Sequence, residues 1–365
     1  MSPKNRLQNV YLEKDLLAAS EVEELRKGLN FEPHYFVRAT LLGSWPGTDI
    51  ADSLLRIRGE LGAPHLSLLP ELADRGYGAT ALARTLACLS ELHVDGAPFG
   101  WRLVSGVGRE QQRAISMLSA DINALADVVG HEKSAGNALK IQLVGPTTLA
   151  ASVYLPNGEL AISDAGATRD LYLSLAEGLK SWLALVQEAT PGEQVYVQFN
   201  EQQLESAVRG SLRTASGLRT YPAVEPHVPE QAMQVLHETV KGVDGKIVVC
   251  GAPSSAYSAT PLTGVSYDVT HFNAYDWEGV AATIESGQQA WLGAVSAEVF
   301  EKAEVIARRL WESWRTVGLS ASKLREVTLT ETGELSNLSP GKATAVAAHL
   351  TEVARILSEL AQGEG

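Results

Sequence analysis

The sequence is poor in cysteine. Its 365 residues include only Cys88 and Cys250, which lie far apart and are flanked by apolar residues. Secreted domains that depend on disulfides use many more cysteines, so the sequence predicts no disulfide framework and is typical of a reducing compartment. We therefore expect a cytoplasmic protein.

Long apolar runs are also missing. Residues 1–6 are followed by an acidic amphipathic segment and lack the apolar core of a secretory signal peptide. No apolar run in the sequence is long enough to span a bilayer. We expect no membrane role.

Positive charge is in the minority. The chain has 30 lysines and arginines against 43 aspartates and glutamates, a net charge of −13, and such a surface repels phosphate backbones. The densest basic stretch, residues 308–315, alternates with Trp311, Glu312 and Trp314 at helical intervals. This spacing is typical of a solvated helix face, so nucleic acid is not an expected partner.

What the sequence does contain is enough apolar residues for a large core, with 45% hydrophobic and 20% charged residues. Residues 12–29 place leucines at intervals of three and four, which predicts an amphipathic helix that ends before Pro33. From Val37 the pattern changes. We therefore expect an N-terminal helical extension over 1–36 and a second unit over 37–365.

Residues 37–365 repeat one unit, in which a short apolar run, a Gly, Pro or Ser loop and a helical stretch follow one another. The predicted strands are 37–42, 66–69, 101–104, 140–144, 194–199, 246–249, 264–269, 290–292 and 327–330. The predicted helices are 80–92, 109–129, 168–189, 229–241, 297–317 and 341–361. The alternation favours an α/β fold of the (β/α)₈ TIM-barrel type, although nine strands compete for eight places. An open doubly wound sheet is disfavoured because no G-x-G-x-x-G follows the first strand.

Four loops follow predicted strands at the end where such barrels carry their active sites. They are Gly43–Thr48 (GSWPGT), Gly145–Thr148 (GPTT), Gln198–Gln203 (QFNEQQ) and Cys250–Pro253 (CGAP). Each also has an ordinary structural interpretation: a tight turn, a helix cap, a solvated loop and a packed cysteine.

In this order, the four segments resemble the catalytic domain of cobalamin-independent methionine synthase and its single-domain relatives. The resemblance extends from about residue 40 to 361, and Leu69–Leu72 with Arg75–Gly76 is similar to the short actinobacterial-type relatives. It implies a TIM barrel of the methionine synthase/uroporphyrinogen decarboxylase-like type. It also implies a methyltransferase of methionine biosynthesis, which uses zinc to move a methyl group from methyl-tetrahydrofolate to homocysteine.

The resemblance departs at the zinc ligands. The family takes them from a His-x-Cys pair, a Glu on the next strand and a Cys near the last strand. Here Val249 and Gly251 stand at the first pair, with Cys250 between them and expected on the opposite face of its strand. Asp268 occupies the position of the family's Glu, and Thr332 occupies the position of its last Cys. We therefore expect a degenerate zinc site, with no metal and no other cofactor.

The amino-acid pocket of the family is better preserved. Gly43 and Ser44 match the segment that holds the substrate carboxylate, whereas Asn200 replaces an aspartate that would pair with the ammonium group. Glu201 and Glu71 remain as carboxylates that can compensate. The expected partner is a small, amino-acid-like molecule.

Three interpretations remain open at this point. The first is a divergent, non-catalytic relative that binds a small molecule. The second is an active methyltransferase with a rearranged activation site made by Cys250, Asp268 and His271, which Glu331 could join. The third is an interaction protein that uses the N-terminal helix and the helix carrying Trp311 and Trp314.

Overall fold

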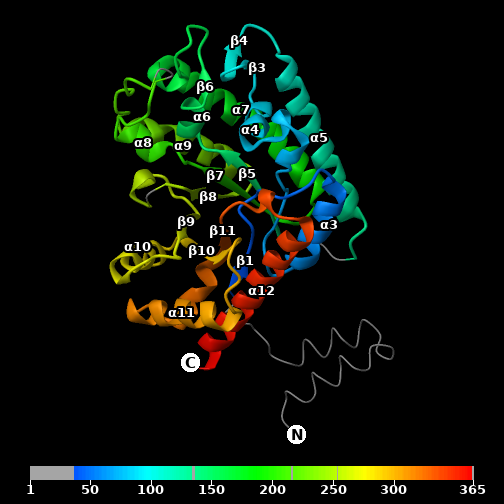
Figure 1. The fold of residues 1–365 in the computed structure, drawn as a ribbon, viewed down its shortest axis with the longest axis vertical. Helices are drawn as coiled ribbons and strands as arrows, with labels where there is room; N and C mark the ends of the chain where they lie inside the picture. Colours follow the sequence, from blue (N-terminus) through cyan, green and yellow to red (C-terminus); the bar gives the residue numbers. More distant parts are fainter. Residues whose placement is uncertain (1–36, 134–135, 215–216, 253, 364–365) are drawn as a thin grey trace.

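The computed structural model describes residues 37–133, 136–214, 217–252 and 254–363 (Figure 1). The predicted N-terminal helical extension therefore lies outside the described residues, and the proposed division at residue 36 stays a prediction. Among the helices of the described part, none is both long enough and apolar enough to cross a bilayer. The two cysteines are buried and free, which confirms the absence of a disulfide between them.

Eight parallel strands form one curled sheet in the order β1-β11-β10-β9-β8-β7-β5-β2. They are β1 (Arg38–Ala39), β2 (Ser67–Leu68), β5 (Ala138–Val144), β7 (Gln194–Asn200), β8 (Lys246–Cys250), β9 (Gly264–Asp268), β10 (Gln289–Ser296) and β11 (Val327–Thr332). The two ends of this order meet, because Leu66 N donates to Ala39 O at 3.0 Å and Ser44 bridges Glu71. The (β/α)₈ TIM-barrel prediction is confirmed.

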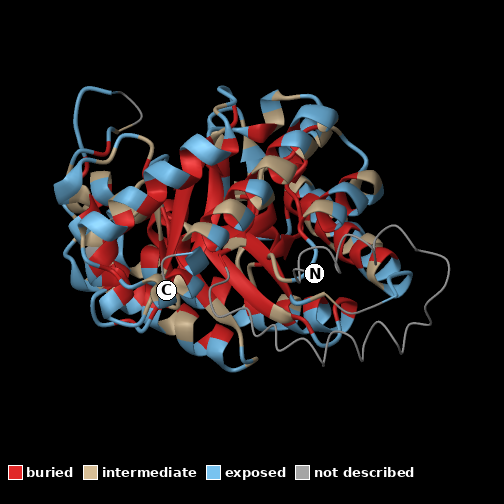
Figure 2. Cartoon of the chain, turned by 90° about the horizontal axis from the view of Figure 1, so that it is seen from below, coloured by how far each residue is buried: buried red, intermediate tan, exposed pale blue. Residues whose placement is uncertain are grey.

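Helices surround the sheet and turn their apolar faces to it, so that red strands lie inside a partly exposed helical layer in Figure 2. The longer ones are α3 (Ile50–Glu60), α5 (Arg109–Gly130), α7 (Ala165–Ala189), α9 (His227–Lys241), α10 (Ala274–Glu285), α11 (Ala303–Thr316) and α12 (Pro340–Gly363). The shorter ones are α4 (Ala81–Ala87), α6 (Pro146–Ala150) and α8 (Leu204–Val208). In these helices the buried apolar residues recur with the 3.6-residue period of the α-helix.

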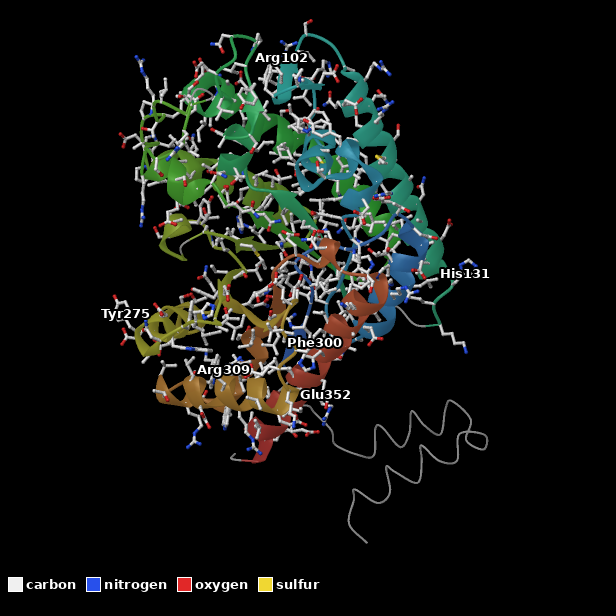
Figure 3. The ribbon with its side chains drawn as sticks, in the orientation of Figure 1. Arg102, His131, Tyr275, Phe300, Arg309 and Glu352 are labelled. Carbon is white, nitrogen blue, oxygen red and sulfur yellow. The ribbon has the colours of Figure 1, made fainter. Side chains whose placement is uncertain are left out.

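Helix α11 shows how the sequence pattern becomes packing. Trp311 and Trp314 are buried in the core, whereas Arg308 and Arg309 are exposed, and Arg309 is labelled in Figure 3. The predicted solvated basic face is confirmed. The two tryptophans stabilise the barrel from outside, so they no longer support an interaction surface.

Two predictions about secondary structure were wrong. The predicted strand 101–104 is β4 (Gly100–Val104), which pairs antiparallel with β3 (His93–Ala97) and parallel with β6 (Val153–Tyr154) in a separate small sheet. A tight hairpin joins antiparallel strands, so β3 and β4 cannot both belong to a parallel barrel. Without 101–104, eight predicted strands remain for the eight strands of the barrel. Helices α3 and α10 were missed; α10 begins at a capping box formed by Asn273 and Asp276.

Candidate functional site

A buried lysine lies at the centre of the polar residues inside the barrel. Lys140, on β5, has no exposed surface. Its Nζ donates to Leu42 O at 3.0 Å, to Gln142 Oε1 at 3.2 Å and to Gln198 Oε1 at 2.8 Å. Because an ammonium group can only donate, both glutamines must turn their amide oxygens toward it.

The two glutamines then point their amide nitrogens away from the lysine. Gln142 Nε2 donates to Leu69 O at 2.7 Å, and the same amide lowers the pKa of the nearby carboxyl group of Glu71. Gln198 Nε2 donates to Leu42 O and to Asn200 Oδ1, both at 2.8 Å. Two relays therefore start at Lys140, one ending on Leu69 O and the other on Asn200.

Charged groups from four segments act on one another around this lysine. Burial lowers the pKa of Lys140, and the nearby Cys250, Glu331 and Glu71 oppose that shift. Burial raises the pKa of Glu331, which accepts a hydrogen bond from Leu42 N at 2.8 Å. Burial also raises the pKa of Glu71, against the lowering influence of Arg84 and Lys140. These groups therefore act on one another electrostatically inside the barrel.

Each of the two buried glutamates has one oxygen that is not paired. Glu331 Oε2 and Glu71 Oε1 make no hydrogen bond within the described residues, although Glu331 is fully buried and Glu71 is 8% exposed. Buried polar atoms are normally satisfied, so these oxygens are candidates for contact with a bound group. The exposed Glu334 lies close enough to raise the pKa of both carboxyl groups.

Glu201 is turned away from these residues. Its Oε1 accepts from Thr147 N at 3.0 Å and Tyr257 Oη at 2.8 Å, and its Oε2 accepts from Thr148 N at 2.9 Å and Thr148 Oγ1 at 2.7 Å. The side chain is fully buried, and burial raises its pKa against these hydrogen bonds. All four bonds tie the end of β7 to α6 and to residue 257.

Strand β8 corrects the expected position of the first ligand pair. Val248 and Cys250 face the barrel interior, where they cluster with Tyr196 and Trp291. Val249 belongs to the outer cluster that packs against helix α9. The prediction that Val249 occupies a ligand position and that Cys250 faces away was wrong by one residue, because α9 covers the opposite face of β8.

The corrected register leaves one thiol inside the barrel. A His-x-Cys pair with both side chains inside would fall on Val248 and Cys250, and not on Val249 and Gly251. Gly251 is exposed at a positive φ of 76°. Burial raises the pKa of the Cys250 thiol to about 11, although Lys140 lowers it in part, so the thiol is protonated at neutral pH.

The other predicted metal positions do not join it. Asp268 is exposed and accepts hydrogen bonds from the backbone and hydroxyl of Thr270, and His271 is exposed as well. In the part of the chain that the structure describes, no group of three or more His, Cys, Asp or Glu residues could hold a metal ion. The alternative set of Cys250, Asp268 and His271 was therefore wrong. Thr332, at the end of β11, is half-buried.

The predicted turn after β1 lies against the lysine network. Gly43 has a φ of +144°, and a Cβ atom there would lie 2.7 Å from Gln142 Cγ, so only glycine fits beside that side chain. Ser44 Oγ accepts from Leu335 N at 3.1 Å. The structure thus places Gly43, Ser44 and Glu71 together, with Glu331 beside Leu42.

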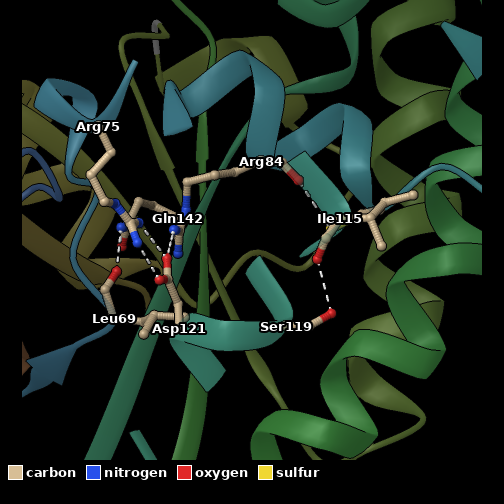
Figure 4. A network of polar contacts seen from close by, with 8 residues as sticks. Leu69, Arg75, Arg84, Ile115, Ser119, Asp121 and Gln142 are labelled. Carbon is tan, nitrogen blue, oxygen red and sulfur yellow. Dashed lines mark hydrogen bonds and ion pairs between the residues drawn. The ribbon is translucent and has the colours of Figure 1, made fainter. Parts of the chain in front are cut away.

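Sequence reasoning missed Lys140 and Gln142, and it named Gln198 only as part of the loop 198–203. Their signal is visible in hindsight: in 138–144 (ALKIQLV) and 194–200 (QVYVQFN), polar residues alternate with apolar ones inside strands that are buried on both faces. It also missed Asp121, which is fully buried between Arg75 and Arg84 (Figure 4). Arg84 connects this ion pair electrostatically with Glu71.

The described chain is similar in structure to a B12-independent methionine synthase from Shewanella sp. W3-18-1, solved in complex with selenomethionine. The match has a TM-score of 0.60 and 12% sequence identity, and it covers 90% of this chain and 99% of that one. A candidate alpha-L-fucosidase from Bacteroides thetaiotaomicron VPI-5482 matches at a TM-score of only 0.28, with 13% identity over 69% of this chain and 68% of its own. No family model and no curated protein match the sequence. The first likeness shows a shared fold.

Proposed function

We propose that this chain binds a small, amino-acid-like molecule at the carboxyl ends of the barrel strands. The observation that carries the proposal is the pair of unpaired, buried carboxylate oxygens on Glu71 and Glu331, beside the Lys140 network. An ammonium group has the donors that these oxygens lack. Ligands of TIM barrels bind at this end of the strands, where Ser44 and Asn200 also lie.

The likeness to methionine synthase supports an amino acid as the ligand class. That structure was solved in complex with selenomethionine, and the resemblance of the four loops implies a substrate of the same kind. We therefore propose methionine and homocysteine as the first compounds to test. Because fold likeness is analogy, the contacts named above carry the proposal for this chain.

We further propose that the chain is a divergent, non-catalytic relative. Zinc that activates a thiol needs thiolate, imidazole or carboxylate ligands in a near-tetrahedral arrangement. The corrected positions offer Val248, the protonated thiol of Cys250 and Thr332, with the ammonium of Lys140 nearby. These residues do not fit a zinc ion, so no step of methyl transfer is assigned to them.

Calorimetric titration of the full chain with methionine and homocysteine tests the proposal. We expect binding by the wild type and at least tenfold weaker binding by Glu71→Gln and Glu331→Gln, because a hydrogen bond to a charged group contributes about 1.5–3 kcal/mol. Glu304→Gln, at an exposed position on α11, is the matched control and should bind as the wild type does.

Two results would overturn the proposal. Binding of neither amino acid would refute an amino-acid ligand, and equal binding by the wild type and both glutamine variants would refute the role of the two carboxylates. Elemental analysis of the purified protein tests the second part separately. One zinc ion per chain would contradict a non-zinc relative.

A further inference from the structure

We infer that Asn200 is a specificity-determining residue that presents amide N–H donors at the carboxyl end of the barrel, so the ligand's carboxylate group binds at β7. This inference rests on the proposed function and deepens it. A side chain that replaces an aspartate would be expected to keep an acceptor for an ammonium group. The hydrogen bonds of this barrel reverse that expectation.

The orientation of Asn200 follows from Lys140 without any freedom in the assignment. The ammonium group donates to Gln198, so the atom of Gln198 that it contacts must be the oxygen. The other end of Gln198 is then an NH₂ group, which donates to Leu42 O and to Asn200. The atom of Asn200 that receives this bond must be its oxygen, and Nδ2 is left on the other side.

The position of Asn200 places its amide at the carboxyl end of the barrel interior. Its neighbours at the alternate positions of β7, Tyr196 and Gln198, face the barrel interior, and Asn200 continues this face at the carboxyl end of the strand. The residue is partly exposed, whereas Gln198 is 1% exposed. No hydrogen bond within the described residues uses Asn200 Nδ2. Two N–H donors are therefore free to meet a ligand.

Charge favours a carboxylate at these donors. The relay from Lys140 through Gln198 aligns the amide dipoles, with their positive ends toward the ligand, and hydrogen-bonded chains of this kind polarise one another. The nearest carboxylate in sequence, Glu201, is buried against α6 and has all four of its hydrogen bonds there. The unpaired oxygens of Glu71 and Glu331 belong to the loop after β2 and to β11. A bound amino acid would thus be oriented with its carboxylate at Asn200, and not at Ser44 as the resemblance implies, and with its ammonium at Glu71 and Glu331.

Two halves of methionine separate these interactions. The first probe, 4-(methylthio)butanoate, is methionine without its amine, and the second, 3-(methylthio)propylamine, is methionine without its carboxylate. In Asn200→Asp, one oxygen can still accept from Gln198 while the other atom changes from a donor to a charged acceptor. Asn200→Ala removes the donors without adding charge. If the aspartate variant does not fold, the alanine variant is sufficient for the test.

We expect Asn200→Asp to bind the butanoate at least tenfold more weakly than the wild type and to bind the amine more tightly. Asn200→Ala should weaken the butanoate and leave the amine unchanged. A loss of both probes to the same extent, or unchanged butanoate binding by both variants, would overturn the inference while the proposed function stands. Failure of methionine, homocysteine and both probes to bind the wild type would overturn the proposed function and the inference with it.

Discussion

Lys140 donates a hydrogen bond of 2.8 Å to Gln198 Oε1 in the interior of the barrel. This contact decides the orientation of two further amides, because the glutamine can receive the ammonium only through its oxygen. A lysine in an apolar strand is costly to bury unless it is paired. Its three acceptors, and the glutamates nearby, offset that cost.

Removal of this ammonium group is expected to destabilise the barrel. In Lys140→Met, the oxygens of Leu42, Gln142 and Gln198 lose their common donor. Leu42 O keeps its bond from Gln198 Nε2, so two buried acceptors are left unpaired, at a cost of about 1–3 kcal/mol each. The variant no longer buries a charged group, which offsets part of this cost. We therefore expect the free energy of unfolding to fall by about 2–4 kcal/mol. Urea denaturation measures the change.

Lys180→Met is the matched control, because that lysine is exposed and pairs with Glu177 on the surface of α7. Its effect should stay within about 0.5 kcal/mol. Equal stability of Lys140→Met and the wild type would show that the buried network contributes nothing to folding.

Glu201 allows a test that separates structure from binding. In Glu201→Gln, one oxygen becomes an NH₂ group that faces the backbone N–H of either Thr147 or Thr148. The orphaned donor should lower the free energy of unfolding by about 1–3 kcal/mol, with methionine affinity unchanged in the folded protein. Denaturation and calorimetry measure the two effects. If Glu201→Gln kept full stability but no longer bound methionine, Glu201 would be a binding residue and not a structural one.

The buried ion pair of Asp121 is predicted to contribute far more than a surface pair. Asp121 accepts two bonds of 2.7 Å from Arg75 and one from Arg84, so Asp121→Asn leaves arginine charge uncompensated and should cost about 3–5 kcal/mol. Asp52→Asn removes an exposed pair with Arg56, which water screens, so its effect on stability should be much smaller. Similar effects of the two substitutions in denaturation would refute the ranking.

Acid should weaken the fold through His65. Its Nδ1 accepts from Ala39 N at 3.1 Å, and burial lowers its pKa to about 4. The unfolded chain binds a proton near pH 6.5 and the folded chain does not until about pH 4, so stability falls as the pH drops across this range. The loss reaches about 3 kcal/mol.

Denaturation at pH 7, 6, 5 and 4 measures this loss. His65→Asn keeps a hydrogen-bond acceptor without an imidazole, and it should flatten the dependence between pH 6.5 and 4. His131→Asn changes an exposed histidine and should leave the dependence as it is. The same slope in the wild type and His65→Asn would show that another group is responsible.

The sequence alone determined the alternation of strands and helices, the amphipathic face of α11 and the turn at Gly43, because these depend on local periodicity and on backbone conformation. It also placed Ser44 and Glu71 after strands, and the structure brings them together. Such features need only a few neighbouring residues to be recognised.

Only the tertiary structure decided which face of β8 carries Cys250, which partners satisfy Lys140 and which atom Asn200 turns outward. A shift of one residue exchanges the two faces of a strand, and the covering helix α9 sets that choice. The partners of Lys140 come from other strands that meet only when the barrel closes, so no pattern within one segment contains them.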